Sequence, residues 1–148
     1  MRRLVIFDWF GTIDLSWHIF DGSYRGTVRE LFSVEGSMYD DPNYFATTNI
    51  GIISTIARKH GVPEKEIESK KNLMLPSYKK NLLDALEKNE LIILPGVREL
   101  FSGLNKREIP LALVSGESRT TLDALVKKAG FDVYFTEDMR SSAEEVEN

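Results

Sequence analysis

Short, continuous apolar runs near the two ends of the chain dominate its hydrophobic pattern. Residues 4–7 and 110–114 form two such runs, both rich in branched residues, and they end at Asp8 and Ser115. Runs of this length and composition predict strands buried on both faces, as in the centre of a parallel sheet. The shorter run over residues 133–136 predicts a third strand.

Helical periodicity flanks the second apolar run. Apolar residues recur at a spacing of three and four over 97–104 and again over 122–129, and the latter segment has Ser118 before it and Gly130 after it as matching caps. Helices and strands that alternate in this way over about 97–136 predict an α/β fold with a parallel sheet and right-handed crossovers.

The middle of the chain has a different pattern. It contains no convincing strand, and glycine and proline breaks separate four predicted helices, over about 23–34, 43–60, 64–75 and 77–89. We therefore expect residues 1–15 and 91–148 to form an α/β core, and residues 16–90 to form a helical cap subdomain inserted after the first strand.

Composition narrows the function classes. The 148 residues include no cysteine, which excludes disulfides, thiolate zinc sites and cysteine nucleophiles, and their two histidines make a multi-histidine metal site implausible. The net charge of −4 gives no indication of a nucleic-acid partner. The apolar runs are too short to span a membrane, and no signal peptide is recognisable at the N-terminus. We expect a soluble, cytoplasmic protein.

The polar residues that follow the two long strands are the first candidates for chemistry. Ligands of open α/β sheets bind beyond the carboxyl ends of the strands, so Asp8 and Ser115 face one another there if their strands are neighbours. Gly11 and Gly116 allow a close approach of backbone to a ligand, and the amides of residues 116–118 precede a helix and suit an anion. A carboxylate nucleophile beside an anion site predicts covalent displacement at phosphorus or carbon. Each residue also has a purely structural interpretation, as a turn former or a helix cap.

These segments resemble the haloacid dehalogenase (HAD) superfamily. Residues 5–13, Val-Ile-Phe-Asp-Trp-Phe-Gly-Thr-Ile, look like its first motif, and residues 111–116, Leu-Ala-Leu-Val-Ser-Gly, look like its second. The order of residues over 94–139 is similar to the family's, and the helical insert matches the position of its α-helical cap. The resemblance covers nearly the whole chain and implies a parallel, Rossmann-like core.

The resemblance implies a hydrolase for a small anionic substrate, most commonly a phosphate monoester. Asp8 would form an aspartyl intermediate and bind Mg²⁺ together with the backbone carbonyl of Phe10, and Thr12 would support this loop. The residues that would hold the substrate or its transferred group are Trp9, Phe10, Gly11, Ser115, Gly116 and Ser118.

The chain departs from the phosphatase pattern at Phe10. Phosphatases of the family carry an aspartate there as general acid and base, and phenylalanine cannot transfer a proton. Dehalogenases carry an aromatic residue at this place, and phosphonoacetaldehyde hydrolases carry a tryptophan where this chain has Trp9. A hydrolase of carbon–halogen or carbon–phosphorus bonds is therefore an alternative, and a catalytically silent HAD-like binding domain is another.

The C-terminal motifs of the family have no clear counterpart. No lysine follows Lys128 to serve as the third motif, and Arg140, the remaining cation, is interpreted as a solvated tail residue. Glu144, Glu145 and Glu147 lie in a polar tail and are poor candidates for the fourth-motif metal ligands. We therefore expect a truncated sheet whose open edge strand permits self-association.

Overall fold

The structure is a computed structural model that describes residues 3–42 and 48–142. Its contacts divide the chain into two compact units, one of residues 1–16 with 90–148 and one of residues 17–89. Each limit lies one residue away from the one expected from the sequence. The two units are described separately below.

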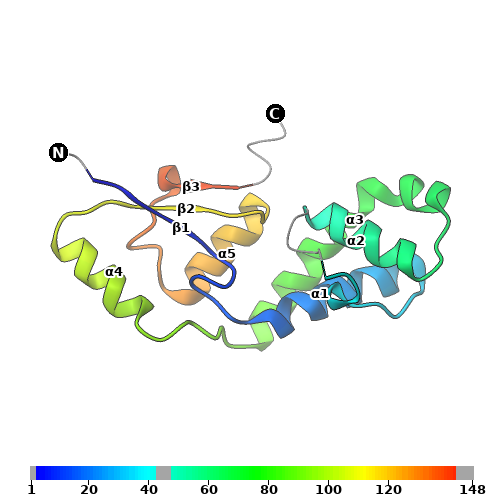
Figure 1. Ribbon diagram of the computed structural model, residues 1–148, viewed down its shortest axis with the longest axis horizontal. Helices are drawn as coiled ribbons and strands as arrows, with labels where there is room; N and C mark the ends of the chain where they lie inside the picture. Colours follow the sequence, from blue (N-terminus) through cyan, green and yellow to red (C-terminus); the bar gives the residue numbers. More distant parts are fainter. Residues whose placement is uncertain (1–2, 43–47, 143–148) are drawn as a thin grey trace. The chain divides into compact units, whose positions relative to one another are not determined.

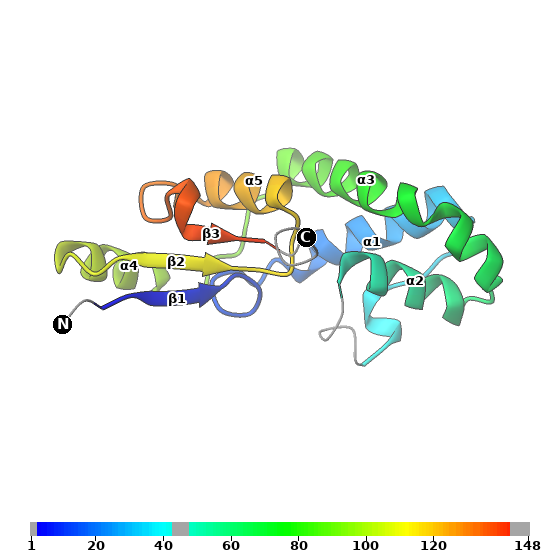
Figure 2. The ribbon, with the colours of Figure 1, turned by 90° about the horizontal axis from the view of Figure 1, so that it is seen from above.

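The first unit is built on a parallel sheet of three strands in the order β1-β2-β3. The strands are β1 (Val5–Asp8), β2 (Leu111–Val114) and β3 (Arg140–Ser141). Helices α4 (Val97–Lys106) and α5 (Arg119–Ala129) supply the crossovers and lie on the same face of the sheet (Figures 1 and 2). The α/β class and the parallel sheet expected from the sequence are confirmed.

The other face of this sheet carries no helix among the described residues, and here the expectation of strands buried on both faces is wrong. Leu4, Ile6 and Val114 are 51%, 60% and 49% exposed. The register pairs Ile6 with Ala112 and Asp8 with Val114, so these side chains share one face. The apolar run of β1 predicted its conformation correctly, but both crossover helices pack on the opposite face.

The covered face of the sheet packs around Phe101 of α4, which is fully buried. Its ring contacts those of Phe7, Phe131 and Phe135 edge to face, with centroids 5.0, 5.1 and 5.1 Å away. Such pairs contribute about 0.5–1.5 kcal/mol each beyond the area they bury. This cluster joins β1, α4 and the segment after α5, and so holds β1 in place against α4.

The third strand lies later in the chain than the sequence predicted. Residues 133–136 form a turn, in which the amides of Tyr134 and Phe135 donate to the carbonyl of Phe131 at 2.9 and 3.1 Å. Val133 is 70% exposed, whereas Phe135 is fully buried in the aromatic cluster. Burial of the phenylalanine rings thus overrides the β propensity of this run, and the strand forms at Arg140–Ser141 after the short helix η3 (Glu137–Met139).

The second unit is helical. It contains α1 (Trp17–Phe32), the 3-10 helix η1 (Met38–Asp40), α2 (Asn49–Lys59) and α3 (Glu64–Lys88). The predicted break before residue 77 is wrong, because α3 continues through Pro76, which is exposed while Met74 and Tyr78 on either side of it are buried. The N-terminal part of the predicted 43–60 helix falls outside the described residues.

Within the described ranges, no helix combines the length and the apolar character needed to cross a membrane.

Candidate functional site

The carboxyl ends of the three strands bring the predicted site residues together. Asp8 pairs in register with Val114, so Ser115 begins the loop beside it. The Ser115 amide in turn donates to the carbonyl of Ser141 at 3.1 Å, which ties this loop to the end of β3. Asp8 is exposed and Ser115 is buried. Residues more than a hundred positions apart in sequence therefore meet at one edge of the sheet, as expected for neighbouring parallel strands.

A tight turn follows Asp8 and fixes its direction. The carbonyl of Trp9 accepts from the amides of Ile13 and Asp14 at 2.9 and 3.2 Å, and the Gly11 amide donates to the Asp14 carbonyl at 3.0 Å. Gly11 has a φ of 71°, a left-handed conformation that glycine adopts without steric cost. The predicted glycine is thus required by the turn itself, which folds residues 9–14 back on themselves.

The candidate ligand-binding groups of this turn have distinct environments. The Trp9 amide donates to Oδ1 of Asp8 at 2.7 Å, so in this structure it serves the carboxylate rather than facing an open site. The Phe10 side chain is half-buried, and Thr12 is exposed, with its amide 3.4 Å from the Trp9 carbonyl. The amide of Trp9 therefore orients one oxygen of Asp8.

The second loop is organised by the start of α5. The Ser118 hydroxyl accepts from the amide of Thr121 at 3.4 Å as the N-cap of α5, and is buried. Ser115 Oγ accepts from the amide of Glu117 at 3.2 Å, and Gly116 is exposed. Ser118 is thus a helix cap, as its structural interpretation predicted, while Ser115 and Gly116 lie nearer the end of β2.

Sequence reasoning missed two buried acids near this edge. Glu117 is 2% exposed, and its Oε2 accepts from the Thr121 hydroxyl at 2.7 Å. Asp14 is fully buried, and its carboxylate accepts from Trp9 Nε1 at 3.2 Å and from the Ser16 amide at 2.9 Å. The available signal for Asp14 was the Asp-x-Ser spacing, since aspartate often accepts from the amide two residues later.

Arg140 corrects another expectation. Its side chain is only 8% exposed and donates to Oδ1 of Asp123 at 2.7 Å, so it is not a solvated tail residue. Two further bonds, of 2.9 and 2.7 Å, reach the carbonyl of Phe135. Arg140 therefore anchors β3 to α5 and to the aromatic turn, and its guanidinium is committed to structure.

The sequence names Asp8 and the backbone carbonyl of Phe10 as the ligands expected for a magnesium ion. Among the described residues, no group of three or more acidic, histidine or cysteine side chains is arranged to hold a metal. Magnesium is commonly held by one or two carboxylates together with substrate oxygens and water, and Asp8 is an exposed carboxylate of this kind. Glu144, Glu145 and Glu147 lie outside the described residues.

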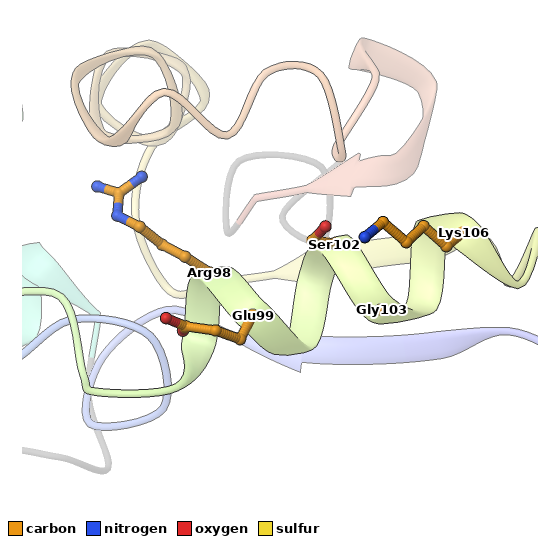
Figure 3. Close-up of a pocket in the computed structure, with 5 residues that line it drawn as sticks. All are labelled: Arg98, Glu99, Ser102, Gly103 and Lys106. Carbon is orange, nitrogen blue, oxygen red and sulfur yellow. The ribbon is translucent and has the colours of Figure 1, made fainter.

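A shallow hollow on α4 is separate from these residues. Figure 3 shows its lining, which comes entirely from one helix: Arg98, Glu99, Ser102, Gly103 and Lys106. Arg98 also donates to the carbonyl of Ala129 at 3.0 Å and stacks over the ring of Phe131. No residue predicted for the site lines this hollow, so the edge formed by Asp8 and Ser115 remains the candidate site.

The structure combines a parallel α/β sheet, an aspartate and a serine at the ends of two adjacent strands, and a helical unit inserted after the first strand. Residues 2–147 match the family model of the haloacid dehalogenase-like hydrolases, and the chain belongs to this family. The comparison with curated proteins gives no match.

Solved structures share the fold at low sequence identity. A point mutant of CbbY from Rhodobacter sphaeroides, in complex with xylulose-(1,5)bisphosphate, is 18% identical with a TM-score of 0.76 over 100% of this chain and 66% of its own. A family IA, variant 3 HAD hydrolase from Entamoeba histolytica is 16% identical, with a TM-score of 0.67 over 96% of this chain and 61% of its own.

A predicted phosphoglycolate phosphatase from Haemophilus somnus is also 16% identical, with a TM-score of 0.72, over 97% of this chain and 63% of its own. The chain thus spans slightly less than two thirds of the length of these structures.

Proposed function

We propose that the chain carries the nucleophile half of a HAD-like hydrolase that acts on a small anionic substrate, in the first instance a phosphate monoester. The observation that supports this proposal most strongly is the register between β1 and β2, with Asp8 paired to Val114 and Ser115 next in line. Two structural neighbours agree with a small organic phosphate, since one was solved with a bisphosphate and another is a predicted phosphoglycolate phosphatase.

In the proposed reaction, a carboxylate oxygen of Asp8 attacks phosphorus while the bond to the leaving oxygen breaks. The Trp9 amide, which donates to Oδ1 at 2.7 Å, holds that oxygen and leaves the attack to Oδ2. The Ser115 hydroxyl and the Gly116 amide bind the transferred phosphoryl group. Water then attacks the aspartyl phosphate, and phosphate leaves with Asp8 restored.

A magnesium ion, held by Asp8 and the Phe10 carbonyl, would neutralise the charge of the phosphoryl group. The chain's own residues leave one task unfilled, because the Phe10 side chain cannot protonate the leaving alkoxide. That proton has to come from solvent, and the absence of general acid catalysis typically lowers a rate by about 10²–10⁴.

Phe10 also favours a second candidate reaction, hydrolysis of a carbon–halogen bond. A halide leaves as a stable anion and takes no proton, so an aromatic residue at this position removes nothing that the first step needs. Asp8 would then attack carbon, expel halide, and form an ester that water hydrolyses. A carbon–phosphorus hydrolase is the related alternative, and a silent binding domain is the non-enzymatic one.

The deciding experiment tests one protein preparation for two activities, release of phosphate from a phosphate ester and release of chloride from a chloro acid. Purified chain is incubated with p-nitrophenyl phosphate and Mg²⁺, with and without EDTA, and in parallel with a 2-chloro acid. Metal-dependent phosphate release that D8N abolishes and D132N retains supports the phosphatase, since Asp132 is exposed and remote in sequence from the predicted site residues. Chloride release lost in D8N supports the dehalogenase instead, and two blank assays overturn both in favour of a binding domain.

For partners, we propose self-association through the open edge of β1. Among the described residues β1 is an outer strand of the sheet, and its Leu4 and Ile6 side chains are 51% and 60% exposed. An outer strand of this kind can pair with a second copy of itself. A two-fold arrangement would continue the sheet from one copy into the other.

A further inference from the structure

Two sets of hydrogen bonds close the turn after Asp8, one between backbone atoms and one between side chains. Its backbone closure joins the Trp9 carbonyl to the amides of Ile13 and Asp14. Its side-chain closure joins the indole of Trp9 to the carboxylate of Asp14, from Nε1 to Oδ2 over 3.2 Å. Both residues are fully buried, so this bond is shielded from solvent. A hydrogen bond in such surroundings is stronger than an exposed one.

The same carboxylate also holds the chain where it leaves the core. Asp14 Oδ1 accepts from the amide of Ser16 at 2.9 Å and from its hydroxyl at 2.5 Å. The Ser16 hydroxyl in turn accepts from the amide of Ile92 at 2.6 Å. Ser16 is the last residue of the first segment of the core, and Ile92 lies just after the chain returns to it.

Backbone bonds run alongside these side-chain bonds. The Leu15 amide donates to the Ile92 carbonyl at 2.8 Å, and the Leu94 amide donates to the Ile13 carbonyl at 2.9 Å. The outgoing and returning segments, residues 13–16 and 92–94, are therefore clasped to each other. Asp14 is the residue that connects this clasp to Trp9, the immediate neighbour of Asp8.

We propose that Asp14 is a positioning residue: through the Trp9 indole it fixes the turn that aims the Asp8 carboxylate, and through Ser16 it fixes that turn to the clasp. The proposal rests on the proposed function, since it assigns Asp14 a role in presenting the nucleophile. Asp14 itself is the fully buried last residue of the turn and acts on the reacting group through Trp9. A displacement of the attacking carboxylate oxygen by about 1 Å can lower the reaction rate by about 10²-fold without weakening substrate binding.

The test compares two buried substitutions in the same network. D14N keeps the size of the side chain but leaves a single acceptor oxygen. Because Ser16 offers two donors and the Trp9 indole only one, that oxygen stays with Ser16, and the amide group faces the indole, which loses its acceptor. S16A removes the hydroxyl link to Ile92 but leaves the Asp14–Trp9 bond in place. Both variants lose buried hydrogen bonds, and only the first releases Trp9.

With p-nitrophenyl phosphate and Mg²⁺, we expect D14N to lower kcat about 10- to 100-fold with KM changed by less than about twofold. S16A should lower thermal stability but keep kcat within about threefold of wild type. Equal losses of kcat in the two variants, or an unchanged kcat in D14N, would overturn the positioning role.

A second readout does not depend on turnover. In ¹⁵N-labelled protein, with the Trp9 and Trp17 indole signals assigned by the W17F variant, hydrogen exchange of the Trp9 indole should be about 10-fold faster in D14N and nearly unchanged in S16A. If wild type hydrolyses no aryl phosphate, the proposed function fails, yet the exchange rates still decide whether Asp14 restrains Trp9. An unaltered Trp9 exchange rate in D14N refutes the inference.

Discussion

Replacement of Phe10 by aspartate is the most direct way to supply the proton that the proposed phosphatase reaction lacks. The residue lies two positions after Asp8, on the turn held by Trp9 and Asp14, so a carboxyl group there projects from a restrained backbone. A positioned general acid typically contributes about 10²–10⁴ to a rate. We therefore expect F10D to raise kcat for a phosphate monoester by about 10²-fold.

The cost in stability is small enough for this test to be made. A fully buried phenylalanine side chain contributes roughly 1.5–3 kcal/mol, and Phe10 is half-buried, so F10D should cost about 1 kcal/mol in the free energy of unfolding. Domains of this size are typically stable by about 5–15 kcal/mol. The variant should stay folded, which thermal unfolding checks directly.

The assay uses two substrates that differ in their need for a proton. Nitrophenolate leaves readily as an anion, whereas an alkoxide does not, so F10D should accelerate hydrolysis of an alkyl phosphate more than that of p-nitrophenyl phosphate. F10N is the matched control, because asparagine has the same size but transfers no proton. Equal rates for F10D and F10N on the alkyl phosphate would refute the assignment of position 10 as the place of the missing general acid.

Three further predictions concern stability and assembly. R140M should lower the free energy of unfolding by about 2 kcal/mol in urea titration, because it breaks the buried bonds to Phe135. The hydrogen bond from His60 holds the pKa of Asp40 below its usual value of about 3.9. The ionised Asp40 side chain therefore stabilises the folded state above that pH, and this stabilisation is lost as the pH falls further. D40N should accordingly lower Tm near pH 7 and match wild type near pH 2. I6K should keep the chain monomeric in sedimentation experiments at concentrations where wild type associates.

Each of these has a control on the exposed surface. R107M and D132N change exposed side chains of the same kinds, and should leave the urea midpoint and the pH profile unchanged. L73K places a lysine on an exposed leucine of α3, 55% accessible, and should leave any self-association intact. A monomeric wild type would contradict the prediction for I6K. A Tm of D40N that stays equally far below that of wild type down to pH 2 would contradict the prediction for Asp40. A urea midpoint of R140M equal to that of R107M would contradict the prediction for Arg140.

Local signals predicted the parts of the fold that depend on neighbouring residues. Ser118 and Gly130 bound α5 as cap residues, since capping needs only the helix and its immediate flanks. Asp8 and Ser115 were predictable for a related reason, because parallel strands always present their carboxyl ends at one edge. The predicted break at the exposed Pro76 was wrong because the packing of its neighbours in α3, not the proline itself, decides whether the helix continues.

What the sequence could not predict depends on contacts between distant residues. Phe135 leaves the predicted strand because its ring packs against that of Phe101 in the core. The role of Asp14 requires that Trp9 be buried and that Ile92 return beside Ser16, 76 residues later in the chain. Neither condition leaves a mark in the local pattern of apolar and polar residues.

The clasp between residues 13–16 and 92–94 also has a consequence for the order of folding. β1 can pair with β2 only after a loop of roughly a hundred residues closes, and such closure is entropically unfavourable. If the helical unit folds first, it ties up most of that loop and shortens the effective closure severalfold, which lowers the entropic barrier by about 1 kcal/mol. The inserted helices would thus act as a folding template for the sheet, and a destabilising substitution in α3 should slow formation of the core even though α3 belongs to the other unit.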